Sequence, residues 1–275
     1  MRSPSALVLG LIHHEDLLRT QSQRRQGVLV AQALTVAGFD VVRVEEYQQN
    51  LVDPQEKGAL VARFLVFRRL WAQEMHHMRE FRRRKGKPLK IPLRKRRQAL
   101  GRAWNSAADN GSFRRTFQRL EIEAALSLKH FRVWKEVVRT KAAGAVIVED
   151  DFYLRDKTSA RDAAQLVKRH CTDFDLIDLA GGLTRNSLGL REATGQDLSL
   201  PFLVANTTCG YFINRRTCEA LVDMVSNKSE LLYLAPDFLI SELNVTGFKG
   251  SSLLPHELPL IHGSRYGNVE SSIPY

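Results

Sequence analysis

Cysteine and long apolar runs are scarce in this chain, and each shortage excludes a class of protein. Its 275 residues include three cysteines, none of which forms a Cys-x-x-Cys pair. They predict neither a disulfide framework nor a structural zinc site, and they favour a reducing compartment. No apolar stretch approaches the roughly 18 residues of a membrane-spanning helix. The run at residues 6–12 is also too short for a secretory signal, so we expect a cytoplasmic protein.

Signatures of common cofactor and nucleic-acid sites are missing as well. No Gly-x-Gly-x-x-Gly follows the first expected strand, at residues 6–12, so a Rossmann dinucleotide site has no support. The sequence also lacks helix-turn-helix, zinc-finger and RNA-recognition signatures. Its hydrophobic content of 44% nevertheless predicts a globular core rather than a disordered chain.

Positive charge is concentrated in one segment. Residues 61–120 hold 18 Lys or Arg against 3 acids, a local balance of +15 within a chain of net charge +11. The rest of the chain is therefore mildly acidic, with a balance of −4. We interpret residues 53–120 as a basic helical insert within a single domain that spans 1–275.

The spacing of apolar residues predicts alternating strands and helices. A strand–helix–strand opening is followed by the insert and then by further alternation, which favours an α/β fold with a mixed, mostly parallel sheet flanked by helices. The expected strands lie at 6–12, 40–44, 145–148, 175–179 and 209–213. The expected helices lie at 16–37, 54–84, from Pro92, and at 113–140, 159–170, 215–225 and 236–243, with a polar linker at 105–112 and a long polar loop at 183–198.

The most informative motif is an apolar, β-branched run at residues 145–148 that ends in Glu149, Asp150 and Asp151. Such a run predicts a buried strand covered on both faces. Three carboxylates at its end repel one another, and a fold tolerates this when a cation or several donors lie opposite. Two interpretations remain open: a divalent-metal site that serves a phosphorylated substrate, or an acidic turn in which Asp150 or Asp151 caps the next segment.

Several landmarks follow one another in a familiar order, and together they resemble glycosyltransferase family 25, the lipooligosaccharide-type and collagen-type β-galactosyltransferases. The resemblance covers roughly residues 121–273. It departs from the family at Lys129, where the family's Leu-Ser-His has serine, and at the end of the first strand, where Gly10–His14 replaces an Asn-Leu-Asp type of sequence. The landmarks are His130-Phe131-Arg132-Val133-Trp134, residues 146–151, Asp175-Leu176-Ile177-Asp178-Leu179, Gly210-Tyr211-Phe212-Ile213, Pro236-Asp237-Phe238-Leu239 and Glu270-Ser271-Ser272-Ile273.

The resemblance implies a GT-A fold and an inverting enzyme that transfers a hexose, expected to be galactose, to a hydroxyl of a glycan or a lipid-linked glycan. The implied donor is a UDP-sugar and the implied cofactor is Mn²⁺ or Mg²⁺, which would neutralise the departing diphosphate. Asp151 is the first expected metal ligand. Glu149 is expected near the ribose or the metal, and His262 in the metal shell.

The resemblance also suggests roles for residues around this motif. Asp237 is the expected catalytic base, although a carboxylate at a helix N-terminus is equally an ordinary cap whose pKa the helix dipole would lower. His130 is expected near the donor but would also suit a helix core. The remaining expected contacts are Asp150, Gly210 and Tyr211 with the donor or acceptor, and Arg185 and Arg191 with an anionic acceptor.

The basic insert supports two alternatives to an enzyme working alone. A non-catalytic nucleic-acid-binding protein could use the run Arg82–Lys85. An amphipathic surface, with cations beside Phe64, Phe67 and Trp71, would suit adsorption to an anionic membrane such as the inner face of the cell membrane. In the plainer alternative these aromatics pack against the catalytic domain. A family member that has lost its activity is a third possibility.

Overall fold

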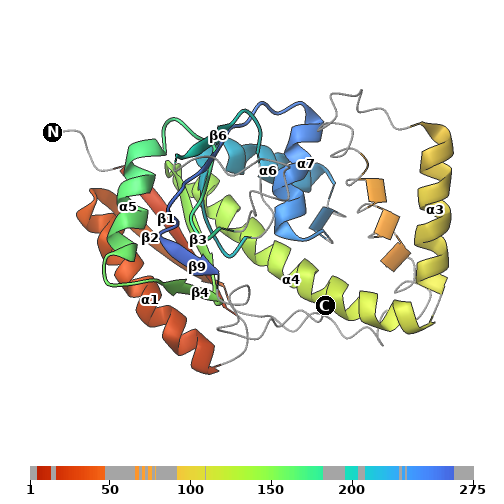
Figure 1. The fold of residues 1–275 in the computed structure, drawn as a ribbon, viewed down its shortest axis with the longest axis horizontal. Helices are drawn as coiled ribbons and strands as arrows, with labels where there is room; N and C mark the ends of the chain where they lie inside the picture. The colour runs from red at the N-terminus through yellow and green to blue at the C-terminus, as the bar shows by residue number, and fades with distance from the viewer. Residues whose placement is uncertain are drawn as a thin grey trace.

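The computed structural model describes residues 5–13, 17–46, 92–108, 110–181, 196–203, 208–228, 231–232 and 234–262, with isolated positions between 66 and 78. A seven-stranded sheet lies at the centre, in the order β2-β1-β3-β7-β5-β8-β6, and a two-stranded sheet pairs β4 with β9 (Figure 1). The strands are β1 (Ser5–Ile12), β2 (Phe39–Glu46), β3 (Gly144–Glu149), β4 (Phe152–Leu154), β5 (Leu176–Asp178), β6 (Leu198–Leu200), β7 (Gly210–Asn214), β8 (Ser252–Leu254) and β9 (Leu260–His262). The helices are α1 (Leu17–Val36), α3 (Leu93–Ala108), α4 (Asn110–Thr140), α5 (Ser159–His170), α6 (Arg215–Asn227) and α7 (Pro236–Thr246).

The large sheet is mixed. β1 runs parallel to β2 and β3, and β5 runs parallel to β8. β7 runs antiparallel to both β3 and β5, and β6 runs antiparallel to β8. Most strands therefore share one direction, which confirms the expected α/β fold with a mixed sheet flanked by helices.

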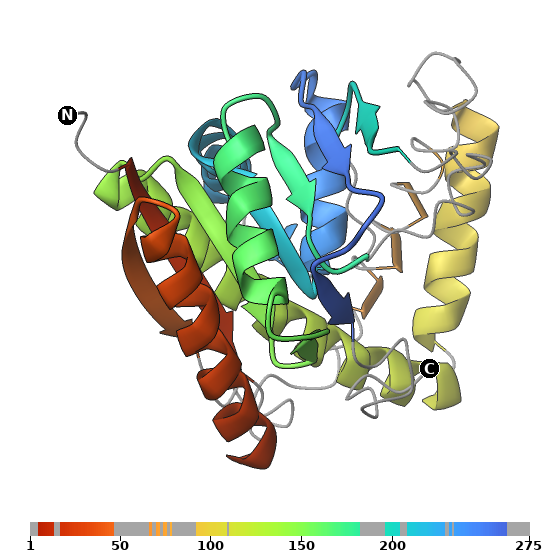
Figure 2. The ribbon, with the colours of Figure 1, turned by 60° about the vertical axis from the view of Figure 1, so that its left-hand side comes forward.

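Helices cover both faces of this sheet, and each face has its own apolar core. Leu7, Leu9 and Leu11 of β1 pack on the side of α1 and α5, whereas Val8 and Ile12 pack on the side of α4, α6 and α7. Figure 2 shows α1 and α5 side by side in front of the sheet. Because both faces are buried, the inner strands are apolar without interruption, as the run at 145–148 predicts.

The structure corrects the expected elements at several points. The polar linker at 105–112 is wrong, because α3 ends at Ala108 and α4 begins at Asn110. Four strands of three residues each were missed, since so short a segment has no periodicity to read. The described positions between 66 and 78 are helical, as expected, but most of the helix at 54–84 lies outside the described residues. So do Arg82–Lys85, Arg185, Arg191, the loop at 183–195 and the motif at 270–273.

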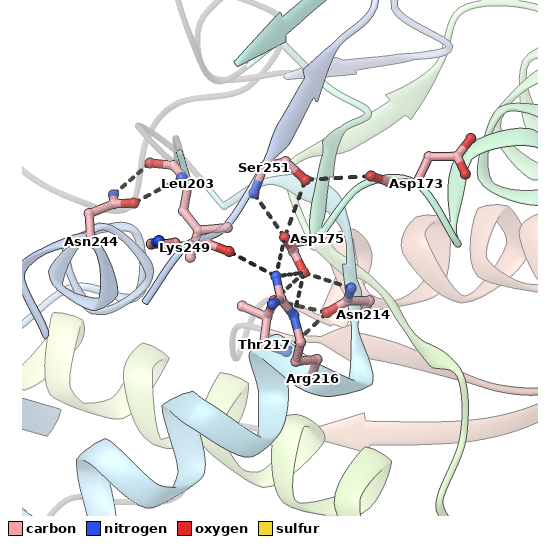
Figure 3. A network of polar contacts seen from close by, with 9 residues as sticks. All are labelled: Asp173, Asp175, Leu203, Asn214, Arg216, Thr217, Asn244, Lys249 and Ser251. Atoms are coloured by element: carbon pink, nitrogen blue, oxygen red, sulfur yellow. Dashed lines mark hydrogen bonds and ion pairs between the residues drawn. The ribbon is translucent and has the colours of Figure 1, made fainter. Parts of the chain in front are cut away.

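A buried aspartate ties the sheet together at the edge where β5 begins (Figure 3). Asp175 precedes β5, and its side chain is 7% exposed. Its carboxylate accepts hydrogen bonds from the Asn214 side chain at 2.8 Å, from the Ser251 backbone N–H at 2.8 Å and from the Arg216 guanidinium at 2.8 Å. Three elements, the end of β7, the start of α6 and the start of β8, therefore depend on one carboxylate.

Replacing Asp175 with alanine should lower the free energy of unfolding by about 3 kcal/mol, because it leaves the donors of Asn214 and Ser251 and the charge of Arg216 without their acceptor. Urea denaturation of the wild type and the variant measures this loss. Asp173→Ala is the matched control, since the Asp173 carboxylate is 61% exposed and its loss should change the unfolding free energy by less than about 0.5 kcal/mol. Equal losses in the two variants would contradict a central role for Asp175.

Candidate functional site

The candidate site lies at the opposite edge of the sheet, where four strands end or begin. The carboxyl ends of β1, β3 and β5 meet the amino end of β7 there, because only β7 among these four runs the other way. Glu149 ends β3, Asp178 ends β5, and Cys209 precedes β7. Ligands of open α/β sheets bind at this kind of edge. The expected position of the three acids is therefore confirmed.

Asp151, Cys209 and His262 form a cluster with metal-ligand chemistry. One ligand atom from each lies within 4.8 Å of the others, and the His262 Nδ1 is 3.5 Å from an Asp151 carboxylate oxygen. The Cys209 thiol hydrogen-bonds to Asp151, and burial together with the charges of Asp151 and Glu149 raises its pKa well above the usual range. Local pairing builds the cluster, because β9 runs antiparallel to β4 and places His262 opposite Phe152, next to Asp151.

Glu149 is buried, and its carboxylate is committed to protein groups. One oxygen accepts a short hydrogen bond from the Thr208 hydroxyl and lies 3.2 Å from the His130 Nε2. The other ring nitrogen of His130 is 2.8 Å from the Tyr211 hydroxyl, which also accepts from the Trp134 indole N–H at 3.2 Å. A chain of hydrogen bonds therefore joins α4, the end of β3 and the start of β7.

One arrangement of protons satisfies every group in this chain. The indole of Trp134 donates to Tyr211, the Tyr211 hydroxyl donates to Nδ1 of His130, and Nε2 of His130 donates to the Glu149 carboxylate. Burial raises the pKa of Tyr211 well above its usual range, which keeps the hydroxyl protonated. The network therefore fixes the ring of His130 and the side chain of Glu149 in position.

Asp237 lies in the first turn of α7, after Pro236 at the start of the helix. The pKa of Asp237 is raised from 3.8 to about 7, mainly by burial and further by the charges of Glu123 and Glu149. Backbone N–H groups at the start of the helix lower this pKa, as expected, but the loss of hydration outweighs them, so the expected net lowering is wrong. Ala235, not Asp237, is the N-cap residue.

The other expected residues have clear positions. Asp150 is buried in the turn after β3. It caps no helix, because β4 follows and the N-cap of α5 is Thr158. Gly210 opens β7, and a side chain there would lie 3.1 Å from Ala180 and Leu260, so its backbone packs closely against both. Tyr211 is hydrogen-bonded to His130 and is buried inside the site.

A lysine is buried at the same edge. Lys129 is 3% exposed, and its ammonium group donates to the backbone carbonyl of His13 at 2.7 Å, just after β1. Burying an ammonium group is costly unless negative charge surrounds it. The hydrogen bond to the His13 carbonyl offsets part of that cost.

Sequence reasoning missed Thr208, Cys209 and Glu123 as site residues. Thr208 comes just before the strand expected at 209–213 and Cys209 begins it, but only the antiparallel pairing of β7 with β3 brings them to Glu149 and Asp151. Glu123 stands on the buried face of α4, where an acid among apolar residues is the available signal. The pairing of β7 with β3 cannot be read from either strand alone.

A hollow of about 660 Å³ lies between α5 and the segment that joins β8 to β9. Charged and polar side chains of both signs line it, among them Arg155, Asp162, Arg169 and His256. Asp151, Cys209 and His262 are not among the residues that line it.

A comparison with known protein families finds no match to this chain, and a search of curated proteins finds no similar sequence.

The raised pKa of Asp237 predicts a pH-dependent stability. Folded Asp237 holds its proton up to about pH 7 whereas the unfolded chain releases it near pH 4, so the folded state binds more protons in between. The free energy of unfolding should therefore fall as pH rises from 4 through 7, by up to about 4 kcal/mol from this residue.

Denaturation of the wild type and of Asp237→Asn at pH 5 and pH 8 measures this effect. The variant should be destabilised less than the wild type by the rise in pH, because its amide does not titrate. Asp223→Asn, on the exposed surface of α6, should behave as the wild type. Parallel pH profiles for the wild type and Asp237→Asn would show that Asp237 titrates normally.

Proposed function

We propose that the protein is a metal-dependent, inverting glycosyltransferase that transfers a hexose, galactose first, from a UDP-sugar to a hydroxyl of a glycan or lipid-linked glycan. The observation that carries the proposal is the meeting of two features at one sheet edge. Asp151 and His262 form a cluster able to hold a cation, and Asp237 is a carboxyl group whose pKa of about 7 suits a general base. The mixed α/β sheet supports a GT-A fold.

The side chains available as metal ligands suit Mn²⁺ better than Mg²⁺. Mg²⁺ requires oxygen ligands, whereas the imidazole of His262 and the thiol of Cys209 are softer. Asp151 and His262 would hold the ion, with Cys209 beside them. A divalent cation held by these residues would supply positive charge to offset the charge of the departing diphosphate.

Asp237 would accept the proton of the acceptor hydroxyl as that oxygen attacks the anomeric carbon of the donor sugar. A carboxylate with an ordinary pKa near 4 is a weak base, and the surroundings of Asp237 raise its proton affinity toward the optimum near neutral pH. Glu149 contributes to this through its negative charge. The hydrogen bonds from Thr208 and His130 keep that charge in place.

Two other buried residues, Lys129 and His130, would assist the reaction. The Lys129 ammonium at the end of β1 would face the anionic donor and share in neutralising the diphosphate. His130 contacts Tyr211 with one ring nitrogen and Glu149 with the other, so it would orient Glu149. Asp237 therefore combines a raised pKa with a position close enough to Glu149 to be influenced by its charge.

Donor binding should depend on both Asp151 and a divalent cation. We expect calorimetric titration with UDP-galactose to show binding in Mn²⁺ that weakens at least about 10-fold in EDTA, and a comparable loss in Asp151→Asn even with Mn²⁺. Asp223→Asn is the matched control and should bind as the wild type does. Equal affinity in Mn²⁺ and EDTA would refute the metal-dependent mechanism.

Turnover should depend on Asp237. Asp237→Asn should lower kcat by about 10²-fold or more while donor affinity stays within about 2-fold, because a general base acts in the transition state. Steady-state transfer and calorimetry on the same preparations separate the two quantities. Normal turnover in this variant would shift the search for the base to Asp197 and Glu242, and to Glu192, which lies outside the described residues.

A further inference from the structure

We propose that α3 is an interfacial helix that attaches this protein to an anionic lipid surface, with Leu93, Leu100 and Trp104 inserted between the headgroups. The proposal rests on the surface of α3 and holds whether or not the sheet edge catalyses glycosyl transfer. The contact surface would be the exposed face of α3.

Large apolar side chains on α3 point away from the fold. Leu93 is 64% exposed, Leu100 is 43% exposed and Trp104 is 61% exposed. Positions 93, 97, 100 and 104 follow the four- and three-residue spacing of one helix face, so these three side chains form a single stripe with Arg97 within it. The stripe spans about 16 Å, from the helical rise per residue.

The opposite side of α3 already has its partners. Ala99 and Ala103 are buried, and α3 packs along α4. Arg102 forms a two-point ion pair with Glu74, at 2.7 and 3.2 Å. The edge of the Trp104 ring meets Phe67 at a centroid distance of 5.7 Å, which fixes the indole while most of its surface stays exposed. The packing of α3 against α4 therefore leaves the stripe facing outward.

The charge of α3 fits a negatively charged surface. Its 16 residues include five cations and no acid. Arg94, Lys95, Arg96 and Arg97 are all exposed, and Arg94 and Arg96 flank the apolar stripe on its two sides. A helix with apolar side chains on one face and cations along its borders lies in the plane of a membrane interface. Phosphate groups of anionic lipids would meet these cations.

A lipid surface explains the apolar side chains better than a nucleic acid does. Nucleic acids recruit cations and aromatic rings, and Leu93 and Leu100 would gain nothing from a phosphate backbone. Among the described residues, no helix is long and apolar enough to cross a bilayer, so the proposed contact is adsorption. The stripe on α3 also replaces the expected one at Phe64–Trp71, since Phe67 and Trp71 are partly buried and Phe64 lies outside the described residues.

Co-sedimentation of the full chain with vesicles tests the proposal. We expect binding to phosphatidylglycerol-rich vesicles and at least 10-fold weaker binding to pure phosphatidylcholine vesicles. The double variant Leu100→Ser, Trp104→Ser should bind the anionic vesicles at least 10-fold more weakly, with an unchanged circular dichroism melting curve. Arg94→Glu, Arg97→Glu should lose binding to a similar degree.

The matched control is Leu29→Ser, Val36→Ser on α1, where the wild-type side chains are 49% and 83% exposed. It should bind vesicles as the wild type does. No binding by the wild type at low salt would overturn the proposal, and so would full binding by the Leu100, Trp104 variant. Tighter binding to an RNA oligonucleotide than to vesicles, lost only with the arginines, would also overturn it and identify nucleic acid as the partner.

Discussion

The whole candidate site depends on burying acids at the end of a fully covered strand. β3 lies between β1 and β7 with helices on both faces, so Glu149 and Asp150 emerge where little water is present. Each carboxylate there needs a compensating group. Glu149 is compensated by its contacts with Thr208 and His130, and Asp151 lies beside His262. Asp237 is compensated by its raised pKa, which favours the protonated form. The buried acids at this end of the sheet are thus accommodated in three different ways.

These three solutions separate the roles of chemically similar residues. Glu149 is held by its contacts with Thr208 and His130, whereas burial and the charges of Glu123 and Glu149 raise the pKa of Asp237. A carboxyl group with a raised pKa is typical of acid–base catalysis. The surroundings of Glu149 and Asp237 therefore give these two acids different properties, which the sequence alone does not distinguish.

Local patterns predicted much of the fold, and tertiary pairing decided most of the site. The βαβ opening, the buried strand before Glu149 and the helix at 159–170 follow from apolar spacing and end close to the expected residues. The approach of Cys209 to Asp151 follows instead from the antiparallel insertion of β7, which no local pattern encodes. The pKa of Asp237 likewise depends on Glu123, more than a hundred positions earlier in the chain. Helix-end chemistry alone gave the wrong direction for that pKa.

The length of α4 has a mechanical consequence. This single helix has 31 residues and runs from the edge of the sheet, where it carries Lys129 and His130, out to α3 (Figure 1). A straight helix of that length extends about 46 Å and resists bending. Its inner half is packed against β1, β3, α6 and α7, and its outer end is joined to α3 through one residue, so it acts as a stiff lever arm. A tilt of α3 would therefore be expected to move the turns of α4 that carry Lys129 and His130.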